Sequence, residues 1–245
     1  MTRPRPRSTV TQSTYARTPA GQLYTWSTSL TQGTQTFCVV FLHGAGSEGA
    51  TNFRTLAEDF ADFGGHSVGL DFLGHGKSDG LMSDSSLRIR GEQARCIIDS
   101  FCAPNLPLLI CGFSMGAHTA LQVSARLGQR VRGLWLLAPA CYAPEAESCP
   151  FGPEFTAVLR RKDSWRSSPA FADAASFRGT AVITTGSLDE TVPWGVIEQL
   201  VRSFRERSQI LQLDILRNVG HNVLAEINDR KQFRLQVVES LALQV

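Results

Sequence analysis

The chain has 245 residues, of which 42% are hydrophobic and 19% charged, and this composition excludes a disordered chain and suits one large α/β domain. Its 24 basic and 22 acidic side chains give a net charge of +2, which provides no overall attraction for nucleic acid or an anionic membrane. No apolar run approaches the roughly 18–20 residues that a membrane-spanning helix needs. We therefore expect neither a nucleic-acid-binding protein nor a membrane protein.

The N-terminal segment, MTRPRPRSTV, alternates arginine with proline and lacks the apolar core of a secretory signal peptide. We expect residues 1–12 to form a disordered basic tail and residues 13–245 to form a single domain. The missing export signal leads us to expect a cytoplasmic location.

Six cysteines are present, and no two of them form the C-x-x-C pair that is typical of zinc or dithiol redox sites. Cys38 and Cys111 lie in apolar runs and are expected to be small core residues. Cys141 and Cys149 are close enough in sequence to bridge one loop, but without an export signal we expect thiols and a reduced protein.

Strand-like and helix-like segments alternate along the chain. Strands are expected over residues 22–27, 36–42, 67–72, 106–113, 132–137, 180–185 and 210–216, and helices over residues 52–63, 87–101, 115–127, 193–207 and 227–243. Several of the strands are continuous apolar runs, as strands buried on both faces are. The alternation predicts an α/β fold with a doubly wound, mostly parallel sheet, and the first two strands, with no helix between them, predict an antiparallel hairpin at its edge.

Residues 140–178 interrupt this alternation, because they contain no strand and are rich in Pro, Ser, Ala and aromatic residues. The segment falls between two strands and therefore lies at the carboxyl edge of the sheet, where ligands bind in open α/β folds. We expect it to form a short lid insertion.

The sharpest local signal is the pentapeptide Gly112-Phe113-Ser114-Met115-Gly116, which follows an apolar strand and precedes a helix. A nucleophile on a sharp strand-to-helix turn needs small neighbours, because its backbone is strained and the chain packs closely around it. The pattern therefore predicts Ser114 as a nucleophile.

A nucleophilic serine needs a histidine base and an acid that orients the histidine, and in this architecture both follow the serine in the chain. His118 lies on the helix that follows Ser114, so its direction is tied to that helix and we expect a packed or surface histidine. His221 lies in a loop after the last strand and can reach back over the sheet edge. Asp189 lies in the loop after the expected strand 180–185 and is the best-placed acid, whereas Asp214 falls inside the expected strand 210–216.

Two backbone N–H groups should bind the oxyanion that forms when the serine attacks a carbonyl. One belongs to Met115, directly after the nucleophile. The second fits the segment His43-Gly44-Ala45-Gly46 after an early strand, in which Ala45 is the best candidate. We expect His43 to hold this loop by local hydrogen bonds rather than to transfer protons.

The pieces HGAG, D-x-x-GHG-x-SD, GFSMG, GSLDETVP and VGHN together resemble the α/β-hydrolase family, in that family's order and over about residues 23–243. The resemblance implies an α/β-hydrolase fold with Ser114, Asp189 and His221 as catalytic triad. A serine at position 114 differs from the aspartate nucleophile of dehalogenase-like and epoxide-hydrolase-like members. We assign no catalytic role to His75 in the GHG segment.

Aromatic and basic side chains are concentrated in the expected lid. Phe151, Phe155 and Trp165 are expected to wall an apolar substrate pocket, although the same residues also suit packing of the lid onto the sheet. A basic cluster could bind an anionic group such as the phosphates of a coenzyme A thioester, or could be a solvated face. It consists of Arg160, Arg161, Lys162 and Arg166.

The predicted function is hydrolysis of a small or medium carboxylic ester or thioester through an acyl-enzyme on Ser114, with no metal or organic cofactor. Two alternatives remain open. One is acyl transfer or C–C bond hydrolysis with the same triad, and the other is a ligand-binding, receptor-like module with little turnover. The substrate is expected to be a small molecule, and the sequence leaves monomer and dimer equally open.

Overall fold

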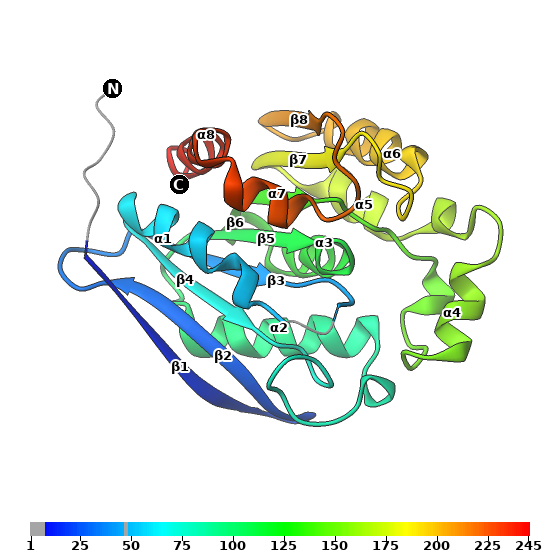
Figure 1. Ribbon diagram of the computed structural model, residues 1–245, viewed down its shortest axis with the longest axis horizontal. Coiled ribbons are helices and arrows are strands. Elements are labelled where there is room, and N and C mark those ends of the chain that lie inside the picture. Colours follow the sequence, from blue (N-terminus) through cyan, green and yellow to red (C-terminus); the bar gives the residue numbers. More distant parts are fainter. Residues whose placement is uncertain (1–7, 47–48) are drawn as a thin grey trace.

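An eight-stranded sheet runs through the centre of the molecule (Figure 1). The computed structural model describes residues 8–46 and 49–245. The strand order is β1-β2-β4-β3-β5-β6-β7-β8; the two pairs β1-β2 and β2-β4 are antiparallel, and the remaining pairs are parallel. The predicted α/β class with a mostly parallel sheet is therefore confirmed.

The strands are β1 (Thr9–Thr18), β2 (Gly21–Leu30), β3 (Phe37–Leu42), β4 (Gly65–Leu70), β5 (Leu108–Phe113), β6 (Val131–Leu137), β7 (Thr180–Gly186) and β8 (Ile210–Leu216). The α-helices are α1 (Arg54–Asp62), α2 (Leu87–Phe101), α3 (Met115–Leu127), α4 (Pro153–Leu159), α5 (Ala170–Ser176), α6 (Trp194–Phe204), α7 (Val223–Asp229) and α8 (Lys231–Ala242).

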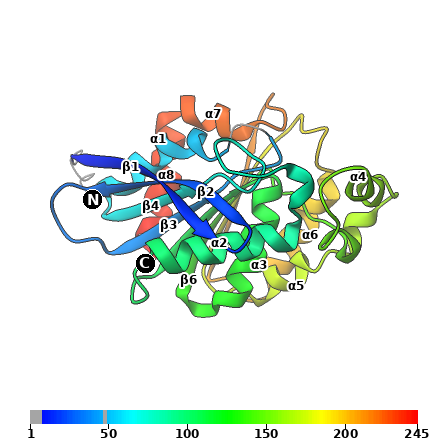
Figure 2. The ribbon, with the colours of Figure 1, turned by 90° about the horizontal axis from the view of Figure 1, so that it is seen from below.

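Helices cover both faces of the sheet and make two apolar cores. Helices α1, α7 and α8 pack on one face, and α2, α3, α5 and α6 pack on the other (Figure 2). All six residues of β3 are buried, as its continuous apolar sequence requires for a strand between two helical layers. Within the described residues, no helix has both the length and the apolarity needed to cross a bilayer.

The N-terminal part of the sheet differs from the prediction in two ways. The basic tail was expected to extend to residue 12, but β1 begins at Thr9 and pairs with β2 along its whole length; residues 1–7 lie outside the described residues. The edge hairpin is β1-β2, and β2 pairs with β4 rather than with β3. Both differences arise because β1 cannot be recognised from its sequence. It is a polar edge strand whose side chains are largely exposed, so it lacks the apolar pattern of a buried strand, and the sequence alone predicts β2 and β3 as the first two strands.

The C-terminal helix expected over residues 227–243 is two helices, because the backbone leaves the helical region at Arg230 (φ −96°, ψ 66°). The side chain of Arg234 closes this break. Its guanidinium pairs with Asp59 of α1 and donates to the carbonyl oxygens of Ile227 (3.2 Å) and Asn228 (2.6 Å) at the end of α7.

The segment between β6 and β7 contains α4, α5 and short 3-10 helices, without a strand, and it projects beyond the sheet at the α4 side (Figure 1). Hydrogen bonds fasten it to the rest of the domain. The Arg88 N–H donates to the Glu147 carbonyl (2.9 Å), and the Phe151 N–H donates to the Ser85 carbonyl (3.0 Å). The side chains of His118 and Gln122 on α3 both donate to the Glu147 carboxylate.

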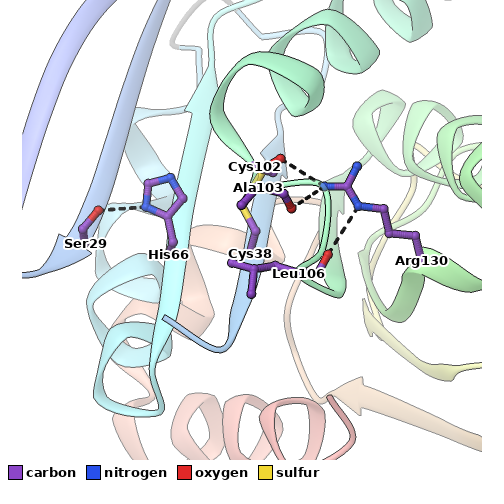
Figure 3. Close-up of a disulfide and its surroundings, with 7 residues drawn as sticks. All are labelled: Ser29, Cys38, His66, Cys102, Ala103, Leu106 and Arg130. Carbon is purple, nitrogen blue, oxygen red and sulfur yellow. Dashed lines mark hydrogen bonds between the residues drawn. A yellow bond between two sulfur atoms is a disulfide. The ribbon is translucent and has the colours of Figure 1, made fainter. Parts of the chain in front are cut away.

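A disulfide joins Cys38 at the start of β3 to Cys102 at the end of α2 (Figure 3). This corrects the expectation that the cysteines are thiols, since Cys38 is a core residue but is not free. Cys102 follows a helix rather than a strand, and sequence spacing alone does not show that its helix returns to the start of β3. Cys111, Cys141 and Cys149 are free, so the possible bridge between the last two is not formed.

Reduction of this disulfide should destabilise the fold substantially. The two cysteines are 64 residues apart, and the chain-entropy model gives about 4 kcal/mol of unfolding free energy for a loop of that length. We expect wild-type protein to unfold at a lower urea concentration with reductant than without it. A Cys38→Ala/Cys102→Ala double variant should be insensitive to reductant, and equal midpoints for the wild type under both conditions would contradict the prediction.

Candidate active site

Ser114 occupies the turn between β5 and α3 with a strained backbone (φ 52°, ψ −114°). The turn is possible because its neighbours lack side chains. A Cβ atom at Gly116 would collide with the carbonyl oxygen of Leu42, and one at Gly112 would collide with the backbone of Gly116. A hydrogen bond from the Ser114 N–H to the Leu137 carbonyl (2.8 Å) ties the turn to β6.

The structure brings the three predicted triad residues together at the carboxyl edge of the sheet. The Ser114 Oγ lies 2.9 Å from His221 Nε2, and His221 Nδ1 lies 2.9 Å from Asp189 Oδ2. A carboxylate can only accept, so Nδ1 carries the imidazole proton and Nε2 is the acceptor for the Ser114 hydroxyl. The second carboxylate oxygen, Oδ1, accepts from the N–H groups of Thr191 (2.9 Å) and Val192 (3.0 Å). Asp189 therefore holds both the ring orientation and the tautomer that a general base requires.

The other candidate histidine is directed elsewhere. His118 is fully buried on α3, and its Nε2 is 2.8 Å from Glu147 Oε1 rather than near Ser114. It is a packed helix histidine, as its position on the helix predicted.

His43 has both ring nitrogens occupied. Its Nδ1 donates to the Gly44 carbonyl (2.8 Å), and its Nε2 accepts from the Phe72 N–H (3.0 Å). Burial, together with the nearby Arg90 and His75, lowers the pKa of His43 well below its usual value. The neutral ring therefore holds the loop, as the sequence predicted, and has no free nitrogen for proton transfer.

The two expected oxyanion donors both border the space above Ser114. Ala45 and Met115 line the same cavity as the Ser114 side chain. The loop approaches the nucleophile closely, because a Cβ at Gly44 would lie 3.2 Å from the Ser114 Cβ. Met115 is the first residue of α3, where N–H groups have no partner within the helix and are available to an anion.

The cavity has a volume of about 940 Å³, which lies in the range of small-molecule sites. Of the described residues that line it, none is Asp, Glu, Lys or Arg. Its apolar wall consists of Met82, Phe113, Met115, Tyr142, Phe151, Phe155, Leu159 and Leu224. The arrangement favours an uncharged, apolar group next to the nucleophile.

Two of the three predicted aromatic pocket residues, Phe151 and Phe155, line this cavity, but Trp165 does not. Trp165 packs edge-on against Phe171, and its ring fills the space beside Gly195. Its assignment to the pocket is therefore corrected: the ring fastens the insertion to α6. The basic cluster of the insertion is exposed and is also not among the residues that line the cavity.

Sequence reasoning missed several residues that line the cavity, Met82, Tyr142, Leu159 and Leu224 among them, and it also missed Arg90 behind the cavity. Tyr142 lines the cavity, and its ring contacts His118 and Phe155 (centroid distances 5.2 and 5.5 Å). Arg90 is fully buried behind the loop that carries Ala45. The sequence does carry a signal for the burial of Arg90. The residue four positions later on the same helix face is the apolar Ala94, not an acid that could pair with Arg90 at the surface.

The family model described as serine aminopeptidase, S33, matches residues 34–167 of the chain. Caffeoylshikimate esterase from Arabidopsis thaliana is 30% identical over 138 residues, which are 54% of this chain and 41% of that protein. The match thus spans about two fifths of that relative's length.

Solved structures share the fold over almost the whole chain. Est1E from Butyrivibrio proteoclasticus with bound ferulic acid superposes with a TM-score of 0.70 at 17% identity, covering 91% of this chain and 98% of that one. The thioesterase domain from the curacin biosynthetic pathway gives a TM-score of 0.69 at 17% identity, covering 94% and 99%. At these identities the likeness establishes the fold.

The Asp173 carboxyl, in the insertion, should make the stability of the fold depend on pH. Burial raises the pKa of this α5 carboxyl to about 6, with His118, Glu147 and Arg126 nearby. The folded-state pKa is above the unfolded value near 3.9, so the folded protein binds more protons between about pH 4 and pH 6, and stability falls as pH rises through that window. We expect Asp173→Asn to stabilise the protein at about pH 8 and to have little effect near pH 4.

Urea unfolding at both pH values measures this effect. Glu198→Gln, which changes an exposed acid on α6, is the matched control, and its stability change at each pH is the baseline for Asp173→Asn. Equal stability changes for Asp173→Asn at the two pH values would contradict the assignment.

Proposed function

Since the chain belongs to the serine aminopeptidase S33 family of α/β hydrolases, we propose that it hydrolyses a small or medium carboxylic ester or thioester through an acyl-enzyme on Ser114. The observation that carries this proposal is the hydrogen-bond chain from Ser114 through His221 to Asp189 beside an apolar cavity. These hydrogen bonds run in the direction that a serine nucleophile needs, with an unprotonated His221 Nε2 next to the Ser114 hydroxyl.

Acylation begins when the Ser114 Oγ attacks the acyl carbon and its proton passes to His221 Nε2. The carbonyl oxygen becomes an oxyanion, which the N–H groups of Ala45 and Met115 bind. His221 then gives its proton to the leaving alcohol or thiol as the tetrahedral intermediate collapses to the acyl-enzyme. Asp189 stabilises the imidazolium that exists between these two proton transfers.

Deacylation repeats the sequence with water as nucleophile. His221 removes a proton from the water as its oxygen attacks the acyl carbon of the Ser114 ester, and a second oxyanion forms in the same place. Return of the proton to Ser114 Oγ breaks the ester and releases the carboxylic acid. The cycle consumes one water for each ester cleaved.

The walls of the cavity favour a neutral acyl group. An aminopeptidase must bind a peptide α-ammonium group, and a buried ammonium needs a carboxylate or a comparable set of acceptors. None of the described residues that line the cavity is acidic, whereas aromatic rings such as Phe151 and Phe155 suit an alkyl or aryl chain. We therefore favour ester or thioester cleavage over peptide cleavage.

The names of two similar proteins suggest one member of the substrate panel. The curated relative is named caffeoylshikimate esterase, and Est1E was solved with ferulic acid. Caffeoyl and feruloyl groups both carry an aryl ring conjugated to the acyl carbonyl. Methyl ferulate therefore belongs in the panel beside p-nitrophenyl esters of increasing chain length and an acyl thioester.

A cytoplasmic location remains our proposal from the sequence, and the Cys38–Cys102 disulfide is the observation that opposes it, because disulfides are rare in reducing compartments. Alkylation of the thiols during cell lysis, followed by mass spectrometry, shows whether Cys38 and Cys102 are reduced or bonded in the cell. Alkylated Cys38 and Cys102 agree with the proposal, and an intact disulfide contradicts it.

Ser114→Ala should abolish hydrolysis of the best ester in this panel, with kcat falling by roughly 10⁴-fold or more, because no other group replaces the nucleophile. The control is Ser124→Ala, which removes a buried hydroxyl from α3, the helix that follows Ser114; this hydroxyl donates to the Leu121 carbonyl (2.8 Å). Normal ester turnover by folded Ser114→Ala would disprove the proposed mechanism.

A further inference from the structure

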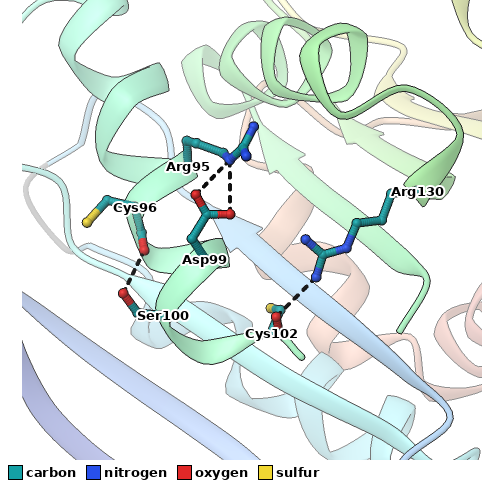
Figure 4. A network of polar contacts seen from close by, with 6 residues as sticks. All are labelled: Arg95, Cys96, Asp99, Ser100, Cys102 and Arg130. Carbon is teal, nitrogen blue, oxygen red and sulfur yellow. Dashed lines mark hydrogen bonds and ion pairs between the residues drawn. The ribbon is translucent and has the colours of Figure 1, made fainter. Parts of the chain in front are cut away.

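Arg90 is a fully buried cation without an acidic partner among the described residues. Its neighbours on α2 show the usual arrangement. Arg88 pairs with Glu92 (2.6 Å), four residues along the exposed surface of the helix. Arg95 pairs in the same way with Asp99 (2.8 Å; Figure 4). A buried guanidinium has a large desolvation cost, so the contacts that replace a carboxylate indicate its purpose.

Those contacts converge on the two halves of the expected oxyanion hole. The guanidinium donates to the carbonyl of His43, and its two terminal nitrogens lie 3.1 and 3.2 Å from the carbonyl oxygen of Gly44. One of them also lies 2.8 Å from the Met115 sulfur. The centroid of the Phe72 ring lies 3.9 Å from the guanidinium carbon of Arg90, so the ring covers the planar face of the guanidinium.

The Gly44 carbonyl and the Ala45 N–H belong to one peptide unit. In a trans peptide these two groups point in opposite directions, so fixing the carbonyl also fixes the N–H. The carbonyl accepts from both Arg90 and the His43 ring, and Ala45 lines the cavity above Ser114. The Ala45 N–H therefore points away from Arg90, and the guanidinium polarises the peptide so that this N–H becomes a stronger donor.

We propose that Arg90 is a positioning residue that sets the oxyanion hole, by fixing and polarising the Gly44–Ala45 peptide and by packing against the Met115 side chain. The inference rests on the proposed function, because an oxyanion forms only if Ser114 attacks an acyl group.

The charge of Arg90 contributes as well as its shape. Burial lowers the pKa of the guanidinium to about 9, so it stays cationic at neutral pH. A fixed cation beneath the peptide favours negative charge at the oxyanion position, and it does so in a region where water does not screen it. A lysine at this position would keep the charge but not the two-pronged contact with the carbonyl.

Arg90→Met tests the inference, since methionine fills much of the same volume without charge or donors. We expect kcat for the best ester to fall roughly 10- to 100-fold with little change in KM, because the lost stabilisation belongs to the transition state. The decisive readout is the rate ratio between that ester and its thionoester. Sulfur accepts hydrogen bonds poorly, so the wild type should discriminate strongly and Arg90→Met should discriminate less.

Arg90→Lys should recover part of kcat and part of this discrimination, and it also provides a second variant if Arg90→Met does not fold. A folded Arg90→Met, or failing that a folded Arg90→Lys, with wild-type kcat and wild-type discrimination would overturn the inference.

Arg130 provides a matched control at the opposite edge of the sheet. Its guanidinium also holds backbone carbonyls, those of Leu106 (3.3 Å), Cys102 (3.0 Å) and Ala103 (2.9 Å), as Figure 3 shows. Arg130→Met should lower stability while leaving kcat and the thionoester discrimination unchanged. A general loss of rigidity would instead affect both variants alike and would contradict the assigned role of Arg90.

The rate of Ser114 phosphonylation by a fluorophosphonate separates this inference from the proposed function. The P=O oxygen of the reagent occupies the oxyanion position, so Arg90→Met should also slow this reaction. If the wild type is phosphonylated but hydrolyses no ester, the proposed function fails while the effect of Arg90 is still measured. If the wild type hydrolyses esters and Arg90→Met matches it in both assays, the Arg90 inference alone fails.

Discussion

The strained backbone of Ser114 is the constraint on which the rest of the site depends. Positive φ at a non-glycine residue is costly, and it persists here because Gly112 and Gly116 let β5, α3 and β3 approach closely. The hydrogen bond from Ser114 to Leu137 and the one from Ala140 back to Ser114 hold the turn on both sides. The hydroxyl is thereby aimed above the sheet edge, where loops from other strands can meet it.

Each remaining part of the site is a loop that follows a parallel strand, so the sheet itself gathers them. The oxyanion loop follows β3, Asp189 follows β7 and His221 follows β8. The cavity above is neutral and apolar along its described residues, whereas the cation Arg90 lies below the oxyanion loop, out of contact with solvent. In the proposed mechanism, this separation keeps positive charge near the carbonyl oxygen of the substrate and away from its other groups.

Local pattern was enough to predict the residues on which the proposed function depends. Ser114, Asp189 and His221 each stand in a short motif whose steric needs are visible in the sequence, and buried parallel strands are plain apolar runs. The misses are features set by tertiary contacts. Strand β1 is polar because it is an exposed edge, and the Cys38–Cys102 bond and the direction of Trp165 depend on where distant segments meet.

Intact-mass analysis after treatment with a fluorophosphonate tests directly whether Ser114 is an activated nucleophile, because the reagent reacts only with a serine that its site has activated. We expect one adduct per chain, mapped by peptide analysis to Ser114 and absent from Ser114→Ala. A folded wild-type protein that forms no adduct, or forms it on another residue, would contradict the assignment of Ser114 as the nucleophile.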